Sequence, residues 1–167
     1  MPHTYDADFR TRLRDCFGHK EGVANLVVAA FEQELTKLHA NLLHRFMDEH
    51  MLLPADIDLI GFHGQTIWHK PEDRQTVQLG DGALLARLTG IDVINDFRSA
   101  DVKAGGHGAP LVPLYHRALS TGLPKPIGII NIGGVSNITW IGGAEDDEIL
   151  AFDMGPGNAL IDDWVLR

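Results

Sequence analysis

The apolar residues between positions 24 and 50 recur every three or four positions, as they do along one face of a helix. They are Val27, Phe31, Leu35, Leu38, Leu42 and Phe46. Pro54 disfavours a helical conformation at the residue before it, so the pattern predicts that this helix ends by residue 54. Apolar runs at 57–62 and 91–94 predict two buried strands, and the alternation at 76–80 predicts a third, half-buried strand.

The pattern predicts three further helices, at 83–89, 111–120 and 159–167. Gly90 closes the first of these, and Pro113 fits only in the first turn of the second. Apolar runs predict three more strands, at 127–132, 138–141 and 149–152. A glycine hairpin at 133–137 joins two of these strands, and residues 145–148 form an acidic turn. Strands separated by helices favour an α/β architecture, in which ligands gather at the carboxyl ends of the strands.

Composition narrows the classes of partner. The chain has 167 residues, 14 Lys and Arg against 23 Asp and Glu, and a formal net charge of −9 without any basic stretch, so we expect no nucleic-acid partner. Its single cysteine, Cys16, cannot form an internal disulfide. No apolar run approaches the roughly 20 residues of a membrane span, and the N-terminus lacks the apolar core of a signal peptide. We therefore expect a cytoplasmic protein without membrane contact.

Several side chains and motifs carry weaker signals. The chain has neither a P-loop lysine motif nor a dinucleotide GxGxxG pattern. Three histidines lack the spacing of a metal site, so no metal ligands are predicted among them: His63, His69 and His107. Arg98 could hold a ligand carboxylate through its planar guanidinium, or it could bridge Asp96 or Asp101 structurally.

Asp153 is the strongest candidate for catalysis. An apolar strand precedes it, and Gly155 and Gly157, which let a backbone approach a ligand closely, follow it. A carboxylate in this place can accept a proton or hold Mg²⁺. It can equally cap the following helix or organise a turn, and the residues alone leave both interpretations open.

Two glycine-rich segments are further candidates for ligand binding. The hairpin at 133–137 could present backbone N–H groups to a phosphate, with Ser136 and Asn137 as additional donors. Glycine turns between strands are commonly only turns, however, so this alternative stays open. The segment at 105–110 is either a ligand loop or a flexible connector.

Five segments, in order along the chain, resemble the anhydro-N-acetylmuramic acid kinase family. They are GFHGQTIWHKP, TVQLGDGALLA, NDFRSADVKAGGHGAPLVPLYH, IINIGGVSNITWI and FDMGPGNALIDDW. The resemblance implies an incomplete α/β fold of the ribonuclease H-like (actin-like ATPase) type. Residues 1–124 would form part of the first actin-like domain, and residues 125–167 would form the start of the second. It further implies a fragment that lacks the family's N-terminal phosphate loop and most of its second domain.

The resemblance implies an ATP-dependent kinase that opens the 1,6-anhydro ring of anhydro-N-acetylmuramic acid with water and phosphorylates O6, in peptidoglycan recycling and amino-sugar metabolism. The sugar and ATP are the implied small-molecule partners, with Mg²⁺ as cofactor. Asp153 matches the aspartate that activates the water. The ATP phosphates are expected at Gly133, Gly134, Ser136 and Asn137. The sugar is expected at His63, Gln65, Thr66, Asp96, Arg98, His107, Gly155, Gly157 and Asn158.

The sequence departs from the family pattern at His107 and at Met154, which lies next to Asp153. Met154 stands where the family has threonine, and His107 stands where it has glutamine. We expect the isolated chain to be inactive, because catalysis by positioning fails when part of the clamp is missing. Two alternatives stay open: a related sugar kinase acting on an ordinary hydroxyl, and a non-catalytic sugar-binding fragment or remnant. The oligomeric state is also open, a homodimer included.

Overall fold

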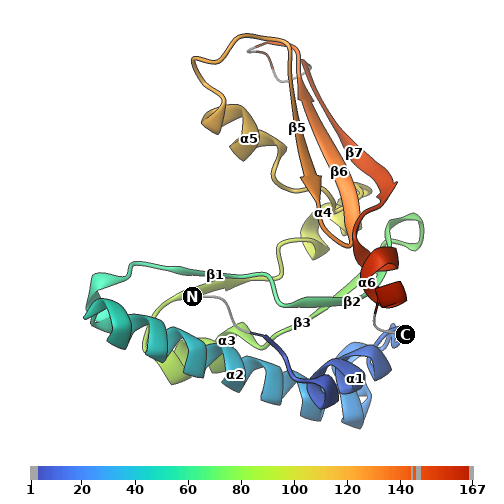
Figure 1. Ribbon diagram of the computed structural model, residues 1–167. Coiled ribbons are helices and arrows are strands. Elements are labelled where there is room, and N and C mark those ends of the chain that lie inside the picture. The colour runs from blue at the N-terminus through green and yellow to red at the C-terminus, as the bar shows by residue number, and fades with distance from the viewer. Residues whose placement is uncertain (1–3, 144, 146–147, 166–167) are drawn as a thin grey trace. The chain divides into compact units, whose positions relative to one another are not determined.

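The computed structural model describes residues 4–143, 145 and 148–165. The chain divides into two compact units, Met1–His107 and Gly108–Arg167. The predicted boundary between two actin-like domains at 124/125 stays a prediction, because compactness alone does not identify family domains. Both units combine helices with strands, so the predicted α/β class is confirmed (Figure 1).

The described residues of the first unit form four α-helices. They are α1 (Ala7–Asp15), α2 (Leu26–His50), α3 (Gly82–Thr89) and α4 (Ser99–Ala104). The long helix α2 confirms the apolar stripe, and its first turn is capped by the side chain of Asn25, which accepts hydrogen bonds from two backbone amides. Gly90 adopts a left-handed conformation directly after α3, as predicted. The short helices α1 and α4 were not predicted.

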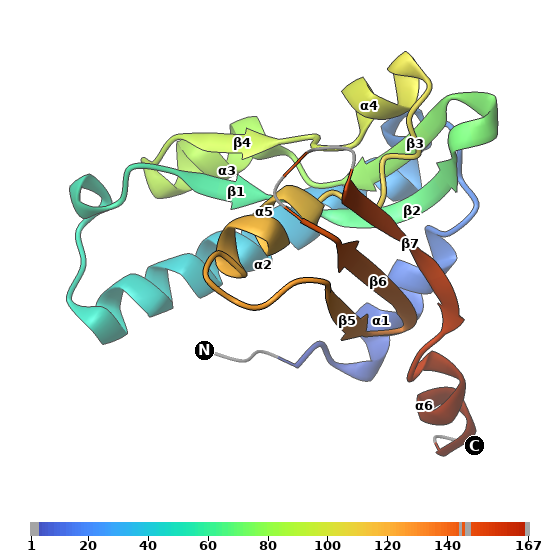
Figure 2. The same ribbon diagram turned by 90° about the horizontal axis from the view of Figure 1, so that it is seen from above.

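Two small sheets accompany these helices. Strand β1 (Ile60–Phe62) pairs in parallel with β4 (Val93–Asn95), and β2 (Gln65–Lys70) pairs antiparallel with β3 (Gln75–Leu79) (Figure 2). The predicted strand at 57–62 is therefore three residues too long, because only its last three residues have a partner in β4. Strand β2 was missed altogether.

The core of this unit lies between α1, α2 and the β2–β3 hairpin. Its buried members are Phe9, Leu13, Cys16, Val28, Phe31, Leu35, Ile67 and Leu79. A second cluster joins Ala40 of α2, Phe62 of β1 and Leu85 of α3. Burial raises the pKa of the Cys16 thiol, which fits an unreactive structural cysteine.

The second unit, as far as its residues are described, is a three-stranded antiparallel sheet with two short helices. Its elements are α5 (Pro113–Leu119), β5 (Ile127–Ile132), β6 (Val135–Ile141), β7 (Ile149–Pro156) and α6 (Ala159–Val165). The strand order is β5-β6-β7. Pro113 occupies the first turn of α5, as predicted. Part of the predicted acidic turn, and the end of the predicted last helix, lie outside the described residues.

Two boundaries in this unit differ from the prediction. Strand β6 begins at Val135, so the hairpin turn is only Gly133 and Gly134. Strand β7 continues past Asp153 to Pro156, because these residues pair with the first residues of β6. Asp153 therefore lies within a strand and not at its tip. None of the helices in the described part of the chain is long and apolar enough to cross a membrane.

Candidate functional site

In the first unit, the predicted sugar-side residues lie at the carboxyl ends of the parallel strands. Phe62 and Asn95, the last residues of β1 and β4, pair with each other. His63 and Asp96, which directly follow them, therefore lie next to each other. Asp96 has a positive φ of 54°, which short polar side chains tolerate better than most. Parallel strands thus bring together two candidates that are 33 positions apart in the sequence.

His63 and Arg98 are joined by a hydrogen bond. The Nε of Arg98 donates to the Nε2 of His63 at 2.9 Å. Since this histidine nitrogen accepts, the other nitrogen carries the proton, and Nδ1 donates to the carbonyl of Gly64 at 2.9 Å. Both ring nitrogens of His63 are therefore engaged. The pair suits positioning of the Arg98 guanidinium, a fixed planar donor for a carboxylate or phosphate.

A cavity of about 280 Å³ lies beside these strand ends. Two of the predicted residues line it, His63 and Asp96. Four polar side chains that the sequence did not single out also line it: Thr76, Gln78, Asn95 and Ser99. Asn95 and Ser99 could have been found from the sequence because they lie close to Asp96. Thr76 and Gln78 of β3 could not, because only strand pairing brings them to the cavity.

The remaining predicted residues of this unit do not line the cavity. Thr66 is hydrogen-bonded to a residue that lines the cavity. The Nε2 of Gln78 donates to the Thr66 hydroxyl at 3.3 Å and to the Thr76 hydroxyl at 2.7 Å. Gln65 is a half-buried residue of β2, paired with Leu79. The side chain of His107 is exposed. The sugar-binding roles of all these residues stay predictions.

In the second unit, the glycine turn and the segment before α6 are bonded to each other. The amide of Gly157 donates to the carbonyl of Gly134, and the amide of Asn158 donates to the carbonyl of Gly133, both at 2.8 Å. A side chain at position 157 would overlap the Gly133 carbonyl oxygen, so this approach requires glycine. Four predicted site residues thus form one backbone cluster.

A row of three polar side chains runs across the sheet next to this cluster. Asn131 of β5 pairs with Asn137 of β6, which pairs with Asp153 of β7. Residues directly opposite in antiparallel strands share a face of the sheet, so the three side chains lie side by side. Among the described residues, none of the three side chains has a hydrogen-bond or ion-pair partner. We call Asn131, Asn137 and Asp153 the polar row.

A β-bulge shapes the end of this row. Ser136 pairs with Gly155 while Asn137 pairs with Asp153, so Met154 is the extra residue of β7. The Ser136 hydroxyl donates towards the carbonyls of Gly155 and Pro156, at 3.1 and 3.4 Å. Its single proton is therefore engaged within the sheet, and its predicted contact with an ATP phosphate stays a prediction.

The two faces of this sheet differ. On the face of the polar row, helix α5 covers Thr139 and Ile141, which are fully buried, and the Nδ1 of His116 lies 2.9 Å from the Thr139 hydroxyl oxygen. The other face carries exposed apolar side chains, which include Ile130, Ile132, Leu150 and Phe152. On the face of the polar row, the Asn137–Asp153 pair comes directly after the Thr139–Ala151 pair that α5 covers. Asp153 therefore lies just outside the covered part of the sheet, and it is exposed.

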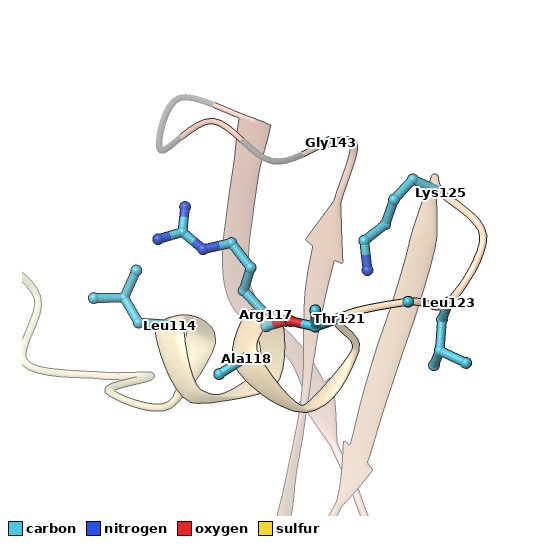
Figure 3. Close-up of a pocket in the computed structure, with 8 residues that line it drawn as sticks. Leu114, Arg117, Ala118, Thr121, Leu123, Lys125 and Gly143 are labelled. Carbon is cyan, nitrogen blue, oxygen red and sulfur yellow. The ribbon is translucent and has the colours of Figure 1, made fainter.

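A cavity of the second unit lies away from these residues. It has a volume of about 530 Å³ beside α5, with Arg117 and Lys125 on either side (Figure 3). The Nζ of Lys125 donates to the carbonyl and hydroxyl of Ser120, at 2.9 and 2.7 Å. None of the predicted site residues lines this cavity. Within residues 4–143, 145 and 148–165, no three His, Cys, Asp or Glu side chains gather as a metal site.

The chain combines an α/β architecture with a glycine turn and an exposed aspartate in one antiparallel sheet. A comparison with known families identifies its family. The family model described as anhydro-N-acetylmuramic acid kinase matches residues 3–167, so the chain belongs to this family. The family has the actin-like sugar-kinase fold, and the chain contains an incomplete form of it.

Curated relatives agree with this assignment. The chain is 51% identical over 163 residues to the anhydro-N-acetylmuramic acid kinase of Rhodospirillum rubrum, covering 98% of this chain and 42% of the relative. It is 55% identical over 162 residues to that of Paramagnetospirillum magneticum, covering 97% and 44%. It is 46% identical over 170 residues to that of Brucella abortus, covering 96% and 45%. The chain thus spans less than half the length of these relatives.

Proposed function

We propose that this chain supplies the catalytic aspartate and part of both substrate sites of an ATP-dependent anhydro-N-acetylmuramic acid kinase. The observation that carries the proposal is the polar row, in which the unpartnered Asp153 carboxylate lies beside the glycine turn. Family membership supports the choice of reaction and substrate.

Asp153 acts as the general base in this proposal. It takes a proton from a water molecule as the water oxygen bonds to the anomeric carbon of the sugar. The bond between that carbon and the anhydro oxygen breaks, and the released oxygen, O6, takes the γ-phosphoryl group of ATP while ADP leaves. Asn137 and Asn131 can orient the water or a sugar hydroxyl through their amide groups, which donate and accept hydrogen bonds.

The glycine turn is proposed to lie against the ATP phosphates. Gly133 and Gly134 carry no side chains themselves, so a phosphate group could approach the backbone of the turn. Mg²⁺ would be held mainly by the phosphates, since this ion commonly binds through one or two carboxylates plus substrate phosphates. Bound there, it would neutralise charge on the transferring group.

The sugar is proposed to contact the His63–Arg98 pair and the cavity beside Asp96. The guanidinium suits the carboxylate of a sugar acid, and the polar lining suits sugar hydroxyls. The proposed contacts with the sugar at His63, Asp96 and Arg98 lie on the first unit, and those with the ATP phosphates lie on the second. The reaction therefore requires a protein that binds both substrates at once. We propose a cytoplasmic location, as expected for recycling of a small sugar.

A chimera tests this proposal. Residues 3–167 replace the matching segment of the Rhodospirillum rubrum relative, and the product is assayed with ATP and either the anhydro sugar or its hydrated form. Phosphorylation of the anhydro sugar, with no activity in the isolated chain, is expected. Phosphorylation of only the hydrated sugar would favour a kinase acting on an ordinary hydroxyl. Sugar binding without ATP turnover would favour a binding module.

A further inference from the structure

Three cationic side chains line a second cavity of the first unit. This cavity has a volume of about 280 Å³. Its charged and polar lining residues are Lys20, Arg74, Lys103, Gln75, Thr76 and Ser99. The whole chain carries a net charge of −9, so this local excess of positive charge is opposite in sign to the rest of the protein. None of the predicted sugar or ATP residues belongs to this lining.

The fold brings these cations together from three separate segments. Lys20 lies two residues after Gly18, and the amide of Gly18 donates to the carbonyl of Ile67 on β2 at 3.1 Å. Arg74 ends the turn between β2 and β3, with a left-handed backbone conformation. Lys103 lies on α4, which packs against β3. The cluster is therefore held by the β2–β3 hairpin and does not arise from one flexible basic segment.

Lys20, Arg74 and Lys103 have no carboxylate partner among the described residues. Two neighbouring acidic residues, Asp73 and Glu21, are engaged with other side chains. Asp73 pairs with Lys70 at 3.4 Å, and Glu21 pairs with His19 at 2.9 Å. Three like charges around one cavity repel one another, and a bound anion relieves this repulsion.

We infer that this cavity binds the phosphate group of a small phosphorylated molecule. Three cations match a phosphate monoester, which carries a charge of about −1.5 to −2 at neutral pH, better than a singly charged carboxylate. The guanidinium of Arg74 presents paired donors to phosphate oxygens, and two lysine ammonium groups act as compact charges. The hydroxyl of Ser99 and the amide of Gln75 add neutral donors.

The cavity adjoins the one at the strand ends. Both are lined by Thr76, Val77 and Ser99, so a phosphorylated ligand of sufficient length could reach from the cationic cavity towards His63 and Asp96. The phosphate site itself rests on the three cations alone. It is independent of the proposed kinase reaction, and it would survive if that reaction were disproved.

The test uses the 167-residue chain with inorganic phosphate and glycerol 3-phosphate as probes, and glycerol and acetate as controls, at constant ionic strength. Binding is followed by calorimetry and by amide chemical shifts. A triple variant, Lys20→Gln, Arg74→Gln and Lys103→Gln, removes the cluster. A matched variant, Arg10→Gln, Lys37→Gln and Arg87→Gln, removes the same charge from exposed helical positions outside the cavity.

We expect saturable binding of both phosphate probes, with shifts at Arg74, Ser99 and Lys103 and much weaker binding of acetate. The cluster variant should weaken binding at least about tenfold, and the matched variant less than about twofold. Equal weakening in both variants, or no saturation at about 20 mM phosphate, would overturn the inference. If the cluster variant loses its cooperative thermal unfolding, the single variant Lys103→Gln replaces it, because the Lys103 side chain is exposed on α4 and its loss should not disturb the fold. An unchanged phosphate affinity in Lys103→Gln would also overturn the inference.

Discussion

Asp153 lies directly opposite Asn137 in the antiparallel pairing of β7 with β6. Because directly opposed residues share a face of the sheet, the carboxylate and the amide lie next to each other beside the glycine turn. Asp153 is also separated from α6 by five residues of strand and loop, so it does not occupy the capping position of that helix. The chemical interpretation of Asp153 thus fits its place in the fold better than the capping interpretation.

The contact between Gly157 and the glycine turn makes the first prediction. Gly157→Ala places a methyl group against the carbonyl oxygen of Gly133, which is backbone and cannot move aside cheaply. We expect a loss of about 1–3 kcal/mol in the free energy of unfolding of the second unit, as for other overpacked sites. Urea unfolding followed by tryptophan fluorescence measures this. Gly128→Ala is the control, because its added methyl group makes only ordinary contact at 3.7 Å, and an equal loss there would contradict the account.

The hydrogen bond between Arg98 and His63 makes the second prediction. In the chimeric enzyme, His63→Ala should remove one hydrogen bond that orients the guanidinium and raise the dissociation constant of the sugar by about tenfold, which corresponds to about 1.4 kcal/mol. The kcat at saturating sugar should change much less, because His63 acts through Arg98 and not on the reacting atoms. His44→Ala, on α2 and bonded to the carbonyl of Leu88, is the matched control. An unchanged sugar affinity in His63→Ala would disprove the positioning role.

The ion pair between Arg12 and Glu34 makes a prediction about pH. Hydrogen bonds from Arg12 on α1 lower the pKa of Glu34 on α2 below its usual value. The pair therefore stabilises the folded state at pH values above the unfolded pKa of glutamate, about 4.3, and loses this contribution as the pH falls through the folded value.

A comparison of melting temperatures between pH 7 and pH 3 tests this pair. The difference between wild type and Glu34→Gln should be largest near neutral pH and should vanish at the acidic end. Both side chains are largely exposed, so the difference should be small and mostly removed by about 1 M salt, where the Debye length is about 3 Å. Glu49→Gln, on the last turn of α2, serves as the control. A difference that grows on acidification would be inconsistent with the pair.

The sequence predicted the elements whose pattern is local. The apolar stripe defined α2, and Gly90 marked the end of α3. Strand β2 was missed because its only buried residue is Ile67, so its alternation is faint. The end of β7 was misplaced because a glycine and proline segment after Asp153 indicates a loop, whereas pairing with β6 keeps it in a strand.

The candidate site was predictable only one residue at a time. Motifs singled out Asp153, Asn137 and the glycines, but the polar row depends on strand register, which no motif encodes. Asn131 was missed for this reason. The cationic cavity was missed because its three charges come from segments that meet only through the β2–β3 hairpin.

The most direct test of the central claim is turnover of the chimeric enzyme with Asp153→Asn, measured together with calorimetric binding of the anhydro sugar. The amide keeps the size and planar shape of the carboxylate but cannot take the proton of water. We predict that kcat falls by about 10²–10⁴ while the sugar dissociation constant changes only a few-fold. Turnover within about tenfold of the unmodified chimera would contradict the role of Asp153 as general base.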